Sequence, residues 1–191
     1  MKTLVFATSN QGKRKELEAL LGPGWQVRTA ADFPHVPEVD EDQPTFEGNA
    51  AKKAHAFAKA TGLLALADDS GLCVDALGGR PGVFSARYGA SDGDRIARLL
   101  KELDGVPEPK RTARFECALC LVTPEGRETF TRGTCEGRII HAPRGANGFG
   151  YDPIFELPNG KTMAELSRDE KSAVSHRGNA FRKLATVLHA P

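Results

Sequence analysis

The chain has 191 residues, four of them cysteine, with 26 lysines and arginines against 25 aspartates and glutamates. This length suits one large domain with its own core. The balanced charge excludes a global field that would recruit nucleic acid or an anionic membrane, so we expect neither as a partner. No apolar stretch is long enough to span a bilayer, and the first apolar run is too short for a signal peptide. We therefore expect a cytoplasmic protein.

The first part of the chain predicts alternating strands and helices. Residues 2–8 are typical of a buried strand, and residues 11–21 have leucines at helical spacing until a Gly-Pro-Gly turn. A short strand is expected at 25–29. After an acidic, proline-rich segment, Thr45 is a suitable N-cap for a helix that runs to residue 60. The apolar run at 63–67 then predicts a buried strand.

The second part predicts a hairpin between helices. The glycine-rich segment 78–82 cannot be regular structure, and it leads into a helix at about 94–103. Two alternating strands at 112–123 and 127–136 flank a Pro-Glu-Gly turn. Ser175 opens the last helix, so the whole chain is predicted to be one mixed α/β domain.

Two adjacent carboxylates, Asp68 and Asp69, follow the apolar run at 63–67, where we expect the strand to end. Neighbouring residues of a strand point to opposite faces. One aspartate can therefore bind backbone or a helix terminus while the other holds a hard metal ion or a water. The alternative is a solvated acidic pair in a turn before Gly71.

The turn at residues 8–13 joins the first strand to the first helix, where backbone N–H groups and the helix dipole favour an anion. Thr8, Ser9 and Asn10 add short polar side chains, and Lys13 adds a point charge. The turn is not a Walker loop, because the long glycine spacing and the terminal Lys-Ser/Thr are missing. The alternative is a plain N-cap.

Two later features could contact a nucleotide. Segment 148–153 sets two glycines around Phe149, which permits close backbone approach and leaves the ring free to stack. A tight turn with a core phenylalanine is the alternative. Lys171, His176 and Arg177 bring cations to the start of the last helix, where they suit an anion or a carbonyl oxygen, unless they form a solvated basic face.

Five blocks of the chain, in this order and with these separations, resemble the inosine triphosphate pyrophosphatase family, the non-canonical purine nucleoside triphosphate pyrophosphatases. The blocks are residues 8–13, 67–72, 78–88, 148–153 and 175–179. The resemblance runs almost end to end. It implies a single domain over residues 1–191 with an elongated mixed central β-sheet, flanking helices and two lobes around a deep cleft, and it implies a homodimer. The activity implied is Mg²⁺-dependent hydrolysis of ITP, dITP and XTP to the monophosphate and pyrophosphate.

The resemblance also implies roles for residues. Asp69 matches the general base and a metal ligand, and Glu41 matches a second metal ligand, although other carboxylates lie nearby. Asp68 is a second choice for the base, and it could instead bind metal or orient Asp69. The implied substrate contacts are Thr8, Ser9, Asn10, Gln11, Gly12, Lys13, Ser70, Phe149, Gly150, Tyr151, Asp152, Lys171, His176 and Arg177.

Base selection has a physical reason. Hypoxanthine and xanthine present an oxygen where adenine presents an amino group, so donors from His176 and Arg177 would accept the first two bases and repel the third. Phe149 would stack on the ring, with Asp152 or Lys171 at its edge. Two rival interpretations remain: a pyrophosphatase for pyrimidine or methylated nucleotides, whose Ser-Pro-Arg turn is missing here, and a regulatory module that binds a triphosphate without cleaving it.

Overall fold

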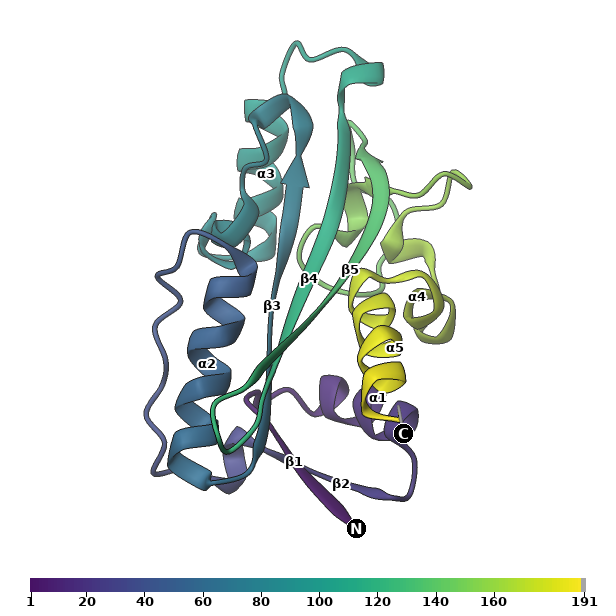
Figure 1. Ribbon diagram of the computed structural model, residues 1–191. Coiled ribbons are helices and arrows are strands. Elements are labelled where there is room, and N and C mark those ends of the chain that lie inside the picture. The colour runs from purple at the N-terminus through teal and green to yellow at the C-terminus, as the bar shows by residue number, and fades with distance from the viewer. Residues whose placement is uncertain (190–191) are drawn as a thin grey trace. The chain divides into compact units, whose positions relative to one another are not determined.

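The computed structural model describes residues 1–189 as a mixed α/β fold around a six-stranded sheet (Figure 1). The strand order is β2-β1-β3-β4-β5-β6; β1 pairs in parallel with β2 and β3, and β5 pairs antiparallel with β6. The strands are β1 (Lys2–Phe6), β2 (Trp25–Thr29), β3 (Leu64–Val74), β4 (Thr112–Val122), β5 (Glu128–Ile139) and β6 (Phe155–Glu156). The α-helices are α1 (Gln11–Leu21), α2 (Phe46–Thr61), α3 (Asp92–Glu102), α4 (Arg168–Val174) and α5 (His176–Leu188).

This architecture confirms the expected mixed α/β class with a mixed central sheet and flanking helices. The deep cleft between two lobes stays a prediction. Residues 190 and 191, which the expected single domain includes, lie outside the described residues.

The described chain forms two compact units. The first contains Met1–Asp69, Cys117–Gly133 and the chain from Gly178 onward. The second contains Ser70–Glu116 and Thr134–Arg177. The boundary falls within β3, between the second of the adjacent aspartates and the serine that follows it.

In the first unit, helices cover both faces of the sheet (Figure 1). One apolar cluster joins Leu17 of α1 and Phe181 of α5 to Leu66 of β3. Another joins Ala54 of α2 to Ala65 of β3. Because adjacent residues of a strand point to opposite faces, α1 and α5 lie on one face and α2 lies on the other.

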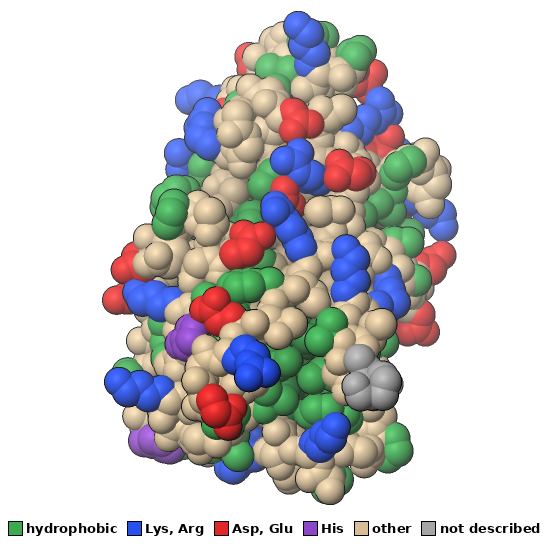
Figure 2. All heavy atoms as spheres, viewed as in Figure 1, with side chains coloured by type: hydrophobic (Ala, Val, Ile, Leu, Met, Phe, Trp, Pro, Cys, Tyr) green, Lys and Arg blue, Asp and Glu red, His purple; other side chains and the backbone are tan. Residues whose placement is uncertain are grey.

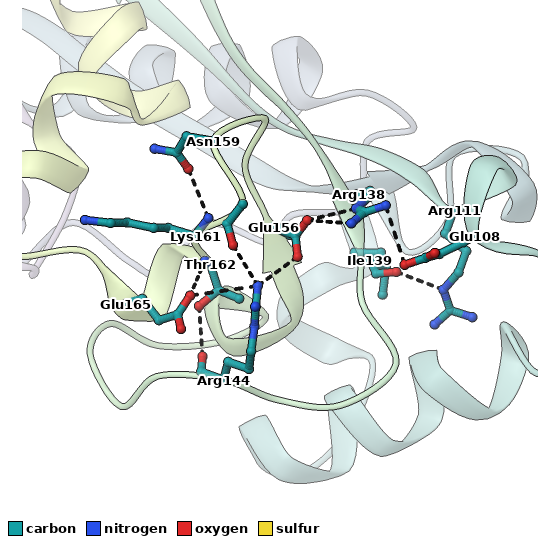
Figure 3. Close-up of polar contacts among 11 residues, drawn as sticks. Glu108, Arg111, Arg138, Ile139, Arg144, Glu156, Asn159, Lys161, Thr162 and Glu165 are labelled. Atoms are coloured by element: carbon teal, nitrogen blue, oxygen red, sulfur yellow. Dashed lines mark hydrogen bonds and ion pairs between the residues drawn. The ribbon is translucent and has the colours of Figure 1, made fainter.

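In the second unit, polar contacts hold the loop that follows β5. Arg111 is only 2% exposed, and its guanidinium donates to the carbonyl oxygens of Leu103 and Ile139 at 2.9 and 2.8 Å. Figure 3 shows the Glu156 carboxylate between Arg138 and Arg144, each with a guanidinium nitrogen 2.7 Å from it. The loop between β5 and β6 is therefore fixed to β6, and this loop carries segment 148–153.

Charged side chains of both signs are interspersed over the face seen in Figure 2. This distribution accords with the nearly balanced composition, so an anionic ligand at that face would meet local cations rather than a broad positive field. Within residues 1–189, no helix combines the length and the apolar character needed to cross a membrane.

One sequence expectation about the strands is wrong. The strand expected at 63–67 does not end before the aspartates but continues as β3 to Val74. Apolar residues resume at Leu72, and Asp68 and Asp69 are both buried within the strand. Their carboxylates are bound by side chains from other elements, so the strand does not have to end in solvent at this point.

The last helix begins where the sequence predicts: Ser175 directly precedes α5, whose first residue is His176. Ser175 is also the C-cap of α4, a short helix that the sequence analysis did not predict. α1 has the expected bounds, and Thr45 is the N-cap of α2, its hydroxyl accepting from the Gly48 amide at 3.0 Å.

Candidate active site

The turn between β1 and α1 places the predicted phosphate contacts together. Asn10 is the N-cap of α1, and its Oδ1 accepts from the backbone N of Gly12 at 2.9 Å and of Lys13 at 3.1 Å. The backbone N–H of Asn10 donates to Thr8 Oγ1 at 3.2 Å. Ser9 lies exposed in this turn, and Gln11 is the exposed first residue of the helix. The Asn10 side chain therefore does act as an N-cap, and the phosphate role of the turn stays a prediction.

Lys13 and Asp68 form an ion pair within the first unit. The Lys13 ammonium lies 2.7 Å from Asp68 Oδ2, and the side chains are 21% and 3% exposed. A carboxylate this buried requires a cation or several hydrogen-bond donors. The pair thus places the positive charge of the N-terminal turn beside the middle of β3.

Asp69 points the other way, toward α2. It is 8% exposed, and its Oδ2 accepts from Nδ2 of Asn49 at 2.8 Å. Asn49, in α2, is fully buried. The expectation that the two aspartates use opposite faces of the strand is therefore confirmed, with Asp68 bound from α1 and Asp69 from α2.

Glu41 reaches the same region through Lys53 of α2. The Lys53 ammonium binds the Glu41 carboxylate and donates to the backbone oxygen of Asp68 at 2.6 Å. Two other carboxylates near Glu41 form ion pairs with different partners: Asp42 with Lys52, and Glu47 with Arg132. Lys53 therefore links the Glu41 carboxylate to the backbone of Asp68.

The donor set suits magnesium. Mg²⁺ in proteins usually takes one or two carboxylates and completes its octahedron with water and substrate phosphates. Asp69 and Glu41 supply hard carboxylate oxygens, and the Lys53 ammonium already lies between Glu41 and the carbonyl of Asp68. These carboxylates are therefore of the ligand type that Mg²⁺ prefers, and the magnesium site itself stays a prediction.

In the second unit, Phe149, Asp152 and Lys171 lie together. Asp152 is 4% exposed, and its Oδ2 accepts from the Phe149 backbone N at 2.9 Å and also binds the Lys171 ammonium. That ammonium is 4.6 Å from the centroid of the Phe149 ring. The ring remains 61% exposed, so a flat ligand could stack on it.

Gly148 is required by this arrangement. Its φ is +79°, a conformation that residues with a side chain rarely adopt, and a Cβ there would lie 2.1 Å from Asp152 Oδ2. Gly150 donates its backbone N–H to Asp92 Oδ2 of α3 at 2.7 Å. The turn around Phe149 is therefore held by two carboxylates from different elements.

The remaining predicted residues lie next to this turn in the chain, at the start of α5, or in β3. Tyr151 is buried and donates to the Ser85 carbonyl at 2.8 Å, and burial raises the pKa of Tyr151. The His176 ring stacks on Phe115, with centroids 5.0 Å apart and planes 18° apart. Arg177 follows it, half-buried. The stacking on Phe115 fixes the plane of the His176 imidazole. Ser70, the last of the predicted residues, follows Asp69 in β3.

The predicted residues thus form two groups, one in each unit. The first unit holds Thr8, Ser9, Asn10, Gln11, Gly12, Lys13, Glu41 and Asp69. The second holds Ser70, Phe149, Gly150, Tyr151, Asp152, Lys171, His176 and Arg177. Within each group, the hydrogen bonds, ion pairs and ring contacts described above connect some members directly.

Sequence reasoning missed Asn49, Lys53 and Asp92. Asn49 carried a signal, because it falls on the same helical face as Phe46 and Ala50, where a polar residue must find a partner. Lys53 carried none, since a charged residue in a predicted helix is ordinary on a surface, and neither did Asp92, which lies just before the helix predicted at about 94–103.

Comparisons with known proteins identify relatives over nearly the whole chain. The model of the Ham1 family matches residues 4–187. A protein of Shouchella clausii named dITP/XTP pyrophosphatase is 52% identical over 193 residues, which cover 98% of this chain and 97% of that protein. The structure of a HAM1 protein from Coxiella burnetii superimposes with a TM-score of 0.93 at 43% identity, covering 98% of both chains. A structure from Mycobacterium abscessus, described as a nucleoside-triphosphatase or dITP/XTP pyrophosphatase, gives 0.83 at 45% identity, covering 98% of this chain and all of that one.

Proposed function

The chain belongs to the Ham1 family, and on that premise we propose that it hydrolyses ITP, dITP and XTP to the nucleoside monophosphate and pyrophosphate, which removes them from the nucleotide pool. The observation that best supports this function is the sequence identity, over nearly the full length of the chain, with proteins named dITP/XTP pyrophosphatase. The polar residues of the first group suit a triphosphate, and those of the second group suit a purine base.

In the proposed reaction, Asp69 orients a water for in-line attack on the α-phosphorus and accepts its proton. The bond from the α-phosphorus to the bridging oxygen breaks, and pyrophosphate leaves. Lys13 and the amides at the start of α1 bind the phosphates, since a helix N-terminus and an ammonium both favour negative charge. The buried contact of Asp69 with Asn49 supports this choice of base, because a base must be held in place.

We propose that Asp69 and Glu41 hold Mg²⁺. When bound, this ion neutralises charge that develops on the phosphate oxygens. The oxygen donors around Lys53 support the proposal. Chelation of divalent cations should abolish turnover, and added Mg²⁺ should restore it.

The second group would select the base. An exposed Phe149 ring suits stacking on a purine. His176, whose ring plane is fixed by Phe115, and Arg177 can donate to the exocyclic oxygen of hypoxanthine or xanthine. In this arrangement Asp152 binds the backbone of the Phe149 turn, and the Lys171 ammonium lies 4.6 Å from the centroid of the ring.

The family resemblance also supports a homodimer, which light scattering after gel filtration would test. We propose that the enzyme acts in the cytoplasm, where nucleoside triphosphates are made and used.

The decisive experiment measures pyrophosphate release from ITP, XTP, GTP and ATP with and without Mg²⁺, with the nucleotide product identified by chromatography. Metal-dependent conversion of ITP and XTP to monophosphates, with ATP nearly inert, is the expected result. Tight binding of ITP without any product would instead favour the regulatory module.

A further inference from the structure

A buried asparagine connects the candidate base to the acidic segment before α2. Asn49 is 0% exposed. Its Nδ2 donates to Oδ2 of Asp69 at 2.8 Å, and its Oδ1 accepts from the backbone N of Gln43 at 2.9 Å. Gln43 lies shortly after Glu41, so one side chain contacts the base and the segment that carries the second candidate metal ligand.

The partners fix which way the amide points. A backbone N–H can only donate, so Gln43 must face Oδ1 of Asn49. The NH₂ group is then directed at Asp69, whose carboxylate accepts hydrogen bonds. The reverse orientation would place two donors together and two oxygens together, both in a site closed to water. The donor role toward Asp69 therefore follows from the chemistry of both partners.

We propose that Asn49 is a positioning residue for hydrolysis: it fixes the rotation of the Asp69 carboxylate and holds the segment that carries Glu41 in register with it. This inference rests on the proposed function. A donor bound to one oxygen restricts rotation about the bond that carries the carboxylate, and a misplacement of about 1 Å can cost about 100-fold in rate. The competing explanation is a buried hydrogen bond that only stabilises the start of α2.

Two substitutions separate these explanations. Asn49→Asp keeps an acceptor for the Gln43 N–H but loses the donor toward Asp69, whereas Asn49→Ala loses both. For Asn49→Asp we expect kcat for ITP to fall about 100-fold with KM changed less than about threefold, while the Gln43 backbone amide keeps its slow hydrogen exchange. For Asn49→Ala we expect a similar fall in kcat together with fast exchange at Gln43.

The matched control is Asn159→Asp. Asn159 is exposed, and its Oδ1 accepts from the Lys161 backbone N at 3.0 Å, so this variant makes the same chemical change at a residue that belongs to neither group. Its kcat should stay within about twofold of wild type.

The outcomes decide between the explanations. If Asn49→Asp keeps kcat within about twofold of wild type, the positioning role is wrong; it is equally wrong if kcat falls only together with loss of protection at Gln43. If Asn49→Asp does not fold, hydrogen exchange of the Asn49 side-chain amide is measured instead. The Asn49 NH₂ protons should exchange slowly in the wild type and faster in Asp69→Ala. Exchange at the solvent rate in the wild type would overturn the inference. A wild type inactive on ITP and XTP would refute the proposed function instead, and the exchange data would still test the link.

Discussion

The Lys13 ammonium lies 2.7 Å from Oδ2 of Asp68, joining the first turn of α1 to the middle of β3. Because Asp68 is almost completely buried, this contact compensates a carboxylate that water cannot reach. Lys13 therefore has a structural partner as well as its proposed phosphate partner.

Lys13→Ala should lower the free energy of unfolding by about 3 kcal/mol, the lower end for breaking a buried pair, since Lys13 is partly exposed. Urea unfolding would measure this loss, and Asp68→Asn together with the double variant would complete a double-mutant cycle. The control is Lys52→Ala, because the Lys52–Asp42 pair has the similar distance of 2.8 Å but side chains that are 38% and 60% exposed. It should cost less than about 1 kcal/mol. Equal losses of unfolding free energy in Lys13→Ala and Lys52→Ala would show that the burial of Asp68 does not strengthen its ion pair.

Asp69→Asn should reduce kcat for ITP by about 10³-fold, within the usual range for loss of a general base. The amide keeps the volume of the carboxylate but cannot accept the proton from water. Steady-state pyrophosphate release measures the change. Asp75→Asn is the control, since Asp75 is half-exposed and binds Thr112 and Arg114 in the second unit. An Asp69→Asn enzyme that kept most of its turnover would exclude Asp69 as the base.

The error at β3 shows what a local pattern cannot predict. Two adjacent aspartates after an apolar run indicate a strand end, since the sequence nearby offers no cation for them. The structure supplies Lys13 for Asp68 and Asn49 for Asp69, and neither partner is close to the aspartates in sequence. The strand therefore continues because of long-range contacts.

Other elements were predictable because their signals are local. Asn10 before α1 and Thr45 before α2 are N-caps next to apolar residues at helical spacing, and both helices begin there. The missed helix α4 also had a local signal: Ser167 and Glu170 form a capping box, a spacing that the sequence displays.

Arg111→Lys should destabilise the second unit. The guanidinium donates to the backbone carbonyls of Leu103 and Ile139, seen for Ile139 in Figure 3, and a lysine ammonium cannot reproduce this fork. We expect a loss of about 2 kcal/mol and a fall in Tm of about 4 to 8 °C, measured by thermal unfolding. Arg138→Lys, at a side chain that is 44% exposed, should cost less than about 1 kcal/mol. A larger loss of stability in Arg138→Lys than in Arg111→Lys would contradict the idea that burial makes the Arg111 contacts important.

Glu102 should contribute a pH-dependent part of the stability. The hydrogen bond from Tyr88, 2.6 Å long, is the largest cause that lowers the Glu102 pKa below its ordinary 4.5, with Arg98 and Arg80 assisting. A carboxyl whose pKa is lower in the folded state stabilises the fold above its ordinary pKa and loses that contribution as the pH falls through the folded value. Glu102→Gln should therefore be less stable than wild type at pH 7 and lose less stability on acidification. Urea unfolding between about pH 3 and 7 would measure this, and Tyr88→Phe should show part of the same change.

His176→Ala should narrow the preference for ITP over ATP. The imidazole at the start of α5 stacks on Phe115, which fixes the plane in which its two nitrogens lie. If one of them donates to the base oxygen, its loss should reduce the ratio of kcat/KM for ITP to that for ATP by about tenfold, the effect of one hydrogen bond of about 1.4 kcal/mol. His55→Ala is the matched control, since His55 lies in α2 and contacts Glu128 at 2.7 Å on the surface. A fall in kcat/KM for both nucleotides with an unchanged ratio would instead assign His176 to binding without base selection, and would leave Arg177 and backbone amides as the source of discrimination.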